Sequence, residues 1–166
     1  MENRQKPPKD DYNRPLPKGK DLPPLVFFPE REWLKGRISS AEYEYAYFRG
    51  KMQYITKQGT GEEVLDEEGN PIPRRQFNIT ILMEDYNLPN GEPRKCWVKL
   101  GASMNQRANL PQFLINLGMD VEGQEDPTPQ EIIDFLEDMD VKLQVATKHG
   151  ENGDYQQVIW DSVKKQ

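Results

Sequence analysis

Alternation of apolar and polar residues predicts β-strands in the first half of the chain. The stretch from Ile38 to Lys57 alternates and is rich in aromatic residues, but Arg49-Gly50 interrupts it. This pattern predicts either one long strand bent at the glycine or two short strands. Residues 74–86 also alternate, and their apolar positions fall on one face: Phe77, Ile79, Ile81 and Met83.

Turn signals connect further strands to these. Asn90-Gly91 predicts a hairpin turn, and Lys95–Leu100 is its expected returning strand. Near the end of the chain, residues 141–148 alternate, Asn152-Gly153 predicts a second turn, and residues 155–163 are expected to form the last strand.

Helical patterns lie between these two groups of strands. Residues 109–118 begin with an N-cap candidate, Asn109, and end in a glycine. Farther on, Thr128 precedes Pro129, and Glu131 follows three residues after the threonine, which together predict a capping box with proline at the first helical position.

The predicted order is three strands, a helical segment and two strands. This order is the connectivity of an OB-fold, a five-stranded and partly open barrel. The expected fold is therefore mainly β (α+β), an OB-like five-stranded barrel with a helical segment between strands 3 and 4. A β-sandwich or a split barrel with a helical lid is the main alternative.

The chain is expected to hold one folded domain. Residues 1–24 carry six prolines and ten charged residues, and are expected to form an extended or disordered tail. Residues 25–166 are expected to form the single domain. The apolar cluster 25–28 is expected to pack the start of this segment against the rest of the domain. Residues 58–73 are rich in Gly, Pro and acids, and predict a long connection.

Composition limits the class of protein. The sequence has no apolar run long enough to span a bilayer, and its first residues lack the apolar core of a signal peptide. One Cys and one His cannot build a zinc site of the usual kind. These features predict a cytoplasmic protein, in a cell or in a virus-infected host, without a disulfide within the chain.

The net charge of −6 is unevenly distributed. Residues 120–140 contain nine acids and no base, and five more acids lie at 62–68. Without those five, residues 25–119 hold twelve Lys and Arg against seven Asp and Glu. A local cationic face is therefore compatible with an acidic chain.

Catalytic signatures are absent from the sequence. It contains no phosphate-binding loop, dinucleotide-binding glycine motif, serine-hydrolase elbow or zinc-protease motif. His149 precedes a turn and is expected to be a solvated polar residue, whereas Cys96 is expected to be a core thiol. We therefore expect a non-enzymatic protein without a cofactor or metal.

Trp97 carries the most informative pattern. Strand geometry places it on one face with Lys95 and Lys99, opposite Cys96 and Val98. An exposed tryptophan between two cations is suited to single-stranded nucleic acid, because the indole stacks on any base and the lysines meet phosphates. The alternative is that Trp97 packs under the helical segment, with the lysines at the rim.

Neighbouring positions extend this candidate site. The polar face of strand 74–86 offers Arg74, Gln76, Asn78 and Thr80, and pairing would join it to the tryptophan strand. In OB-folds the ligand also lies between the loops that join strands 1–2 and 4–5. The candidate nucleic-acid-binding residues are Trp97, Lys95, Lys99, Arg74, Arg75, Asn78, Lys51, Lys57, Lys148 and Tyr155.

A row of tyrosines at 43, 45 and 47 invites a second stacking interpretation. The opposite face of that strand carries Glu42 and Glu44, which belong in water. We therefore expect the tyrosines to point inward or to lie under the tail.

The stretch from Phe77 to Trp160 resembles the single-stranded-DNA-binding proteins of phage and mobile-element replication modules. The similar features are the apolar strand 77–83, the tryptophan strand 96–98, a short helix ending at Leu117-Gly118, an acidic helical stretch, and a final strand with the pattern Tyr155-Gln-Gln-Val158. The resemblance implies an OB-like fold without catalysis, and binding of single-stranded DNA during replication or recombination.

Two functions follow as hypotheses. The first is a non-catalytic protein that binds single-stranded DNA, or RNA, in replication or recombination. The alternative is a protein-interaction or structural subunit of a larger assembly. In the first case, replication or recombination proteins are expected to dock on the N-terminal tail or on the acidic helix. In the second, the barrel surface or the acidic helix 128–139 docks a partner and the Pro-rich tail wraps another chain. No membrane is expected to be involved.

Overall fold

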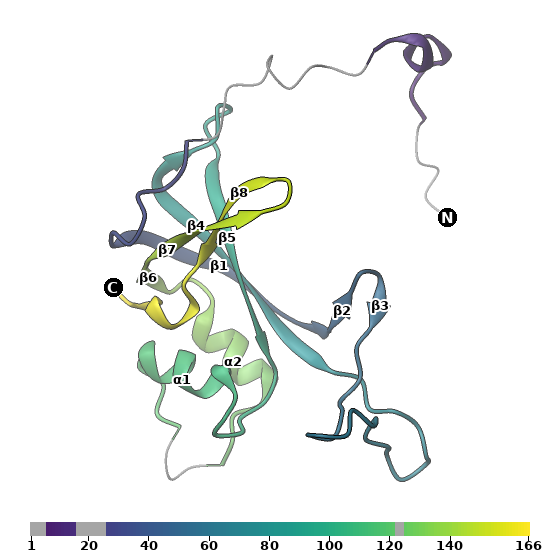
Figure 1. Cartoon of the computed structure of the whole chain (residues 1–166). Helices are drawn as coiled ribbons and strands as arrows, with labels where there is room; N and C mark the ends of the chain where they lie inside the picture. Colours follow the sequence, from purple (N-terminus) through teal and green to yellow (C-terminus); the bar gives the residue numbers. More distant parts are fainter. Residues whose placement is uncertain (1–5, 16–25, 122–124) are drawn as a thin grey trace.

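The computed structural model describes residues 6–15, 26–121 and 125–166. Figure 1 shows a twisted sheet with two helices below it, a hairpin beside its upper part and an arm that projects to one side. Both helices follow three strands of the sheet and precede the fourth in the chain. The predicted mainly β architecture, with its helical segment at this position, is confirmed.

The central sheet is antiparallel and five-stranded, in the order β5-β4-β1-β6-β9. Its long strands pair because their alternating apolar residues share one buried face. The strands are β1 (Leu34–Tyr45), β4 (Arg75–Asn87), β5 (Pro93–Gly101), β6 (Asp140–Leu143) and β9 (Lys164–Lys165).

Each strand of this sheet has a core face and an open face. On β4 the core face carries the predicted set, Phe77, Ile79, Ile81 and Met83, all nearly inaccessible to solvent. A bulge in β1 between Ile38 and Ser40 shifts the pairing with β4 by one residue. Because of that shift, the buried positions of β1 are even-numbered up to Ile38, whereas the next buried position is the odd-numbered Ala41.

Two short helices cover one end of the core face: α1 (Asn109–Asn116) and α2 (Pro129–Leu136). The Thr128 hydroxyl accepts a hydrogen bond from the Glu131 backbone N–H at 3.2 Å, which confirms the predicted cap. In α1, however, the N-cap is Ala108 rather than Asn109, and it makes no side-chain capping bond.

A second hairpin stands at the opposite end, formed by β7 (Val145–Gly150) and β8 (Gly153–Val158). β7 continues from β6 after a break at Gln144, whose backbone N–H donates to the Ser162 hydroxyl at 2.8 Å. The expected last strand 155–163 is therefore too long. It stops at Val158 and is followed by the 3-10 helix η3 (Trp160–Ser162) and then β9.

The region between β1 and β4 differs from both predicted alternatives. β1 begins at Leu34 and ends at Tyr45, and the chain then reverses at Arg49-Gly50 between β2 (Tyr47–Phe48) and β3 (Lys51–Met52). Residues 53–74 extend this projection and are held together by isolated bridges, such as Thr56 with Glu63. We call the whole projection, residues 46–74, the arm.

The N-terminal part of the chain includes a 3-10 helix, η1 (Lys9–Asn13). The expectation of a tail over residues 1–24 lies partly outside the described residues, as does Leu25 of the apolar cluster. Within that cluster Phe28 is buried and meets Tyr86 edge to face, whereas Val26 and Phe27 are exposed. Of the described residues 26–28, Phe28 is therefore the one whose side chain joins the domain core. In the described part of the chain, no helix is long and apolar enough to cross a bilayer.

Candidate functional site

Trp97 stands on the open face of β5 with 55% of its surface exposed. Lys95 and Lys99 flank it on the same face, as strand geometry predicted. The alternative position, under the helical segment, is wrong, because the helices cover the core face on which Cys96 and Val98 are buried.

The adjacent strand β4 extends this face with polar side chains. Thr80 pairs with Trp97 and Asn78 pairs with Lys99, so the predicted contiguous polar face is present. Asn78 Oδ1 is buried, and within the described residues it has no hydrogen-bond partner. Farther across, Glu42 of β1 pairs with Asn78. Next to Trp97, the cations of this face therefore come from β5 and not from the paired positions of β4 and β1.

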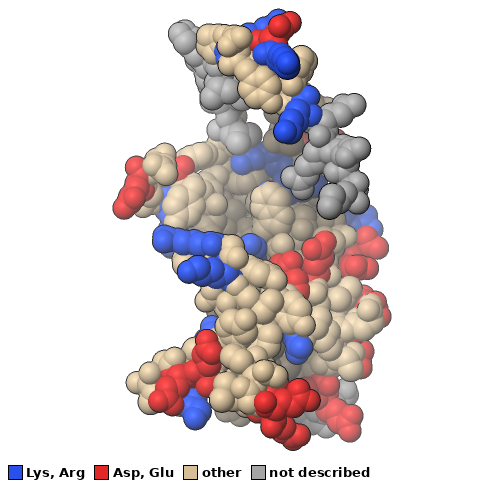
Figure 2. Space-filling view, turned by 90° about the vertical axis from the view of Figure 1, so that its right-hand side faces the viewer, with Lys and Arg blue, Asp and Glu red and all other residues tan. Residues whose placement is uncertain are grey.

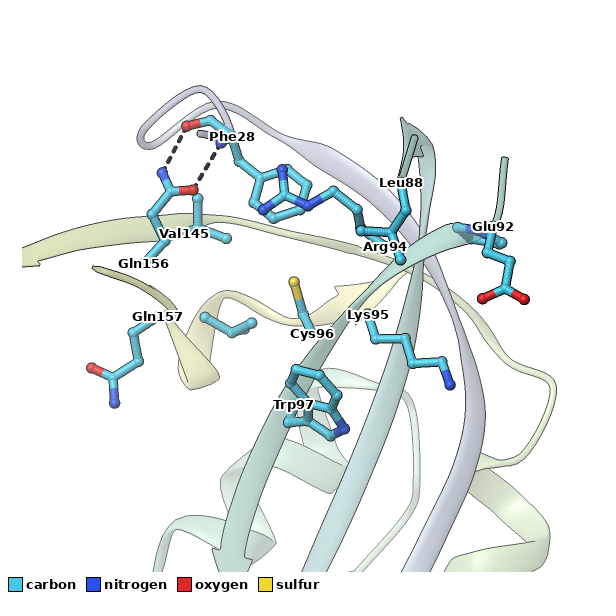
Figure 3. Close-up of a pocket in the computed structure, with 12 residues that line it drawn as sticks. Phe28, Leu88, Glu92, Arg94, Lys95, Cys96, Trp97, Val145, Gln156 and Gln157 are labelled. Atoms are coloured by element: carbon cyan, nitrogen blue, oxygen red, sulfur yellow. Dashed lines mark hydrogen bonds between the residues drawn. The ribbon is translucent and has the colours of Figure 1, made fainter. Parts of the chain in front are cut away.

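A cavity of about 500 Å³ opens beside Trp97, between β5 and β8. Figure 3 shows the Cys96 thiol pointing into it, with Phe28 and Arg94 above and Trp97 below. The Arg94 guanidinium lies 3.8 Å from the centre of the Phe28 ring and donates to the backbone carbonyl of Val26. This stack forms a fixed upper wall of the cavity.

A second cavity, of about 480 Å³, lies on the other side of the same junction. Trp97, Lys99 and Lys148 line it together with Trp160. Trp97 therefore lines both cavities, and the hairpin places Lys148 beside it. Tyr155 pairs with Lys148 in the β7–β8 ladder and is about half exposed.

Four predicted site residues lie away from the Trp97 face. Lys51 and Lys57 belong to the arm, and not to the first strand of the sheet as the sequence suggested. Arg74 lies at the root of the arm, where its Nε donates to the Tyr54 carbonyl at 3.1 Å. Arg75 lies two residues before Phe77, on the same face of β4, and its guanidinium lies 5.5 Å from the Tyr45 ring centre.

The tyrosine row is only partly inward. Tyr43 is on the core side and its ring centre lies 5.4 Å from that of Phe77, as expected. It is nevertheless 40% exposed, and Tyr45 and Tyr47 are more exposed still. The core ends at Phe77, so β1 runs past it and the expected burial of the whole row is wrong.

Figure 2 shows Lys and Arg side chains beside a hollow in the upper half of the face that it draws, with groups of Asp and Glu to the left, to the right and below. Burial raises the pKa of the Cys96 thiol to about 11, although nearby Arg94 opposes the shift. The thiol is therefore protonated near neutral pH and forms an apolar part of the wall.

His149 lies at the end of the same hairpin. Its Nδ1 is 2.7 Å from an Asp154 oxygen, and this hydrogen bond raises the pKa of His149. It is fully exposed, which agrees with the expected role of a solvated turn residue.

Sequence reasoning missed a second exposed tryptophan, Trp33. It is 50% exposed, and the ammonium groups of Lys142 and Lys164 lie 5.2 and 5.4 Å from its ring centre. Lys35 pairs with Lys142 on the same open face. The spacing of Trp33 and Lys35, two positions apart, could have indicated a tryptophan and a lysine on one strand face. Only the tertiary pairing places Lys142 and Lys164 beside Trp33.

Among the described residues, no group of His, Cys, Asp and Glu is arranged to hold a metal ion. The site therefore consists of an exposed indole, flanking cations and two open cavities. Comparison with protein-family models and with curated proteins finds no match to this chain.

Proposed function

We propose that this protein binds single-stranded nucleic acid, most readily single-stranded DNA, through the Trp97 face of β5. The observation that carries the proposal is the exposed indole of Trp97 between Lys95 and Lys99, beside an open cavity. An indole stacks on a base whatever its identity, and flanking lysines displace the counterions of the phosphates.

The strand arrangement supports an OB-like barrel as the carrier of this site. β1 pairs with β4 on one side and with β6 on the other, and β8 lies beside the free edge of β5. This order of neighbouring strands, with helices between β5 and β6, supports an OB-like arrangement. In such folds the second and third strands, here β4 and β5, present the ligand face.

The proposed role is non-catalytic protection or presentation of single strands in replication or recombination. The resemblance to phage and mobile-element replication proteins motivates this context. In the same proposal, the N-terminal tail and the acidic helix α2 serve as contacts for partner proteins.

A fluorescence titration tests the proposal directly. The intact protein is titrated with labelled oligo(dT) and with duplex DNA of equal length at two salt concentrations. We expect binding of the single strand in preference to the duplex, weaker binding at high salt and quenching of tryptophan emission. Absence of single-strand binding at low salt would overturn the proposal.

One observation favours a protein-interaction subunit as a second candidate function. The arm exposes several large apolar side chains far from the core: Tyr47, Phe48, Ile55 and Leu65. Exposed apolar side chains that gather on one projection are typical of protein contacts. Elution as a stoichiometric, nucleic-acid-free complex would support this candidate over the first.

A further inference from the structure

We propose that the cavity between β5 and β8 takes one unstacked base of the bound strand. The inference rests on the proposed function, and deepens it by assigning a base-binding subsite next to the stacking surface. It implies that bound DNA does not lie flat across β5, but turns one base inward beside Trp97.

The walls of the cavity suit the flat, apolar faces of a nucleobase. The apolar part of the walls includes Phe28, Leu88, Val145, Val158 and the protonated thiol of Cys96. The volume of about 500 Å³ is within the usual range for sites that enclose a small organic group.

The rim supplies the polar groups that a base edge requires. β5 is the last strand of its sheet, and no backbone hydrogen bond joins it to β8 in the described part of the chain. Its edge therefore presents free N–H and C=O groups to the cavity. The exposed Gln157 side chain also lines the cavity and makes no hydrogen bond in the described structure.

The wall opposite β5 is held in place before any ligand arrives. The Gln156 side chain bonds both the N–H and the C=O of Phe28, each at 2.8 Å, as drawn in Figure 3. The Arg94 guanidinium also stacks on the Phe28 ring through a cation–π contact. A preformed slot lowers the cost of ordering on binding.

Cations outside the slot favour a nucleic acid over a peptide as its occupant. Lys95 lines the mouth of the cavity, as does Glu92, and Figure 3 shows the Lys95 ammonium directed away from the cavity. A strand with one base in the slot would keep its phosphates outside, near Lys95. An extended peptide added to the β5 edge would use the backbone groups but not the indole and the cations.

Cys96 provides a reporter inside the cavity, because it is the single cysteine of the chain. The intact protein is labelled at alkaline pH with iodoacetamide, a neutral reagent that reacts with the thiolate, alone and with oligo(dT) or an oligonucleotide of equal length made of stable abasic nucleotides. Each is present at about ten times its own Kd, so that about nine-tenths of the protein is bound. Both ligands carry the same phosphates, so their electrostatic effect on the thiol is matched.

We expect oligo(dT) to slow Cys96 labelling by about tenfold, because only the free fraction reacts. The abasic oligonucleotide should leave the labelling rate close to that of the free protein. Equal protection by both ligands would show that backbone alone covers the cavity, and would overturn the subsite. Tight binding of oligo(dT) without any protection would also overturn it, while leaving the proposed function intact.

A cavity-filling variant provides an independent test. Val158→Phe narrows the slot, and Ile55→Phe adds the same kind of bulk at an exposed position of the arm. We expect V158F, but not I55F, to lose the affinity difference between oligo(dT) and the abasic oligonucleotide. An unchanged difference in a folded V158F protein would overturn the inference. If V158F does not fold, the labelling of the unmodified protein decides. Failure of every oligonucleotide to bind would instead reject the proposed function itself.

Discussion

Trp97 and Thr80 are direct partners in the antiparallel ladder between β5 and β4, and both side chains stand on the open face. The short threonine side chain leaves the neighbouring indole about half exposed. A tryptophan held by a paired strand on a rigid sheet loses little freedom when a base stacks on it. This relationship underlies the first prediction.

Substitution Trp97→Ala should weaken binding of oligo(dT) by about 1–3 kcal/mol, with little dependence on base sequence. Fluorescence anisotropy of a labelled oligonucleotide measures the effect. Trp33→Ala is the matched control, because Trp33 is similarly exposed and also lies beside lysines. Loss of affinity in W33A but not in W97A would move the binding site to the open face of β1, β6 and β9.

Substitution Lys95→Gln should reduce the salt dependence of binding more than it changes the preference among bases. For single strands, one lost phosphate contact lowers the slope of log K against log salt by about 0.7. Titrations at several salt concentrations give the slope. Lys35→Gln, on the same face but on β1, two strands away from β5, should leave it unchanged. Equal slopes for the original protein and K95Q would remove Lys95 from the phosphate path.

Gly36→Ala should destabilise the fold, because a Cβ at Gly36 would lie 2.7 Å from Ile81 Cγ2 and 3.0 Å from the Leu82 carbonyl oxygen. Such crowding in a packed core costs about 1–3 kcal/mol. Gly101→Ala is the control, since a Cβ there meets nothing within 4 Å. Urea unfolding of both variants provides the comparison, and equal midpoints would contradict the close packing of β1 on β4.

His149 should titrate above its ordinary pKa of 6.5, because its imidazolium bonds Asp154. A raised folded-state pKa means that the pair contributes stability below about pH 6.5, and loses it as the pH rises through the folded-state value. NMR titration can follow the imidazole without ambiguity, because the chain has a single His. Asp154→Asn should return the pKa toward 6.5, and an identical pKa in D154N would contradict the contact.

Local sequence patterns predicted most of the individual elements. The alternation in 74–86, the Asn90-Gly91 turn and the Thr128 cap each correspond to an observed strand, turn or cap. These signals depend on residues that are close in sequence, so no tertiary information is needed. The arm was not predicted, because isolated bridges such as Thr56 with Glu63 leave no periodic pattern. The bulge in β1, which depends on pairing with β4, was also missed.

The candidate site divides in the same way. The sequence alone determined that Trp97, Lys95 and Lys99 share one face of a strand, because side chains alternate along any strand. Only the tertiary structure decided that this face is open and that β8 lies beside β5 to form the cavities. It also brought Phe28 next to Arg94, and Trp33 next to Lys142 and Lys164. Those contacts join residues far apart in the chain, so they follow from strand order and register, which local periodicity does not specify.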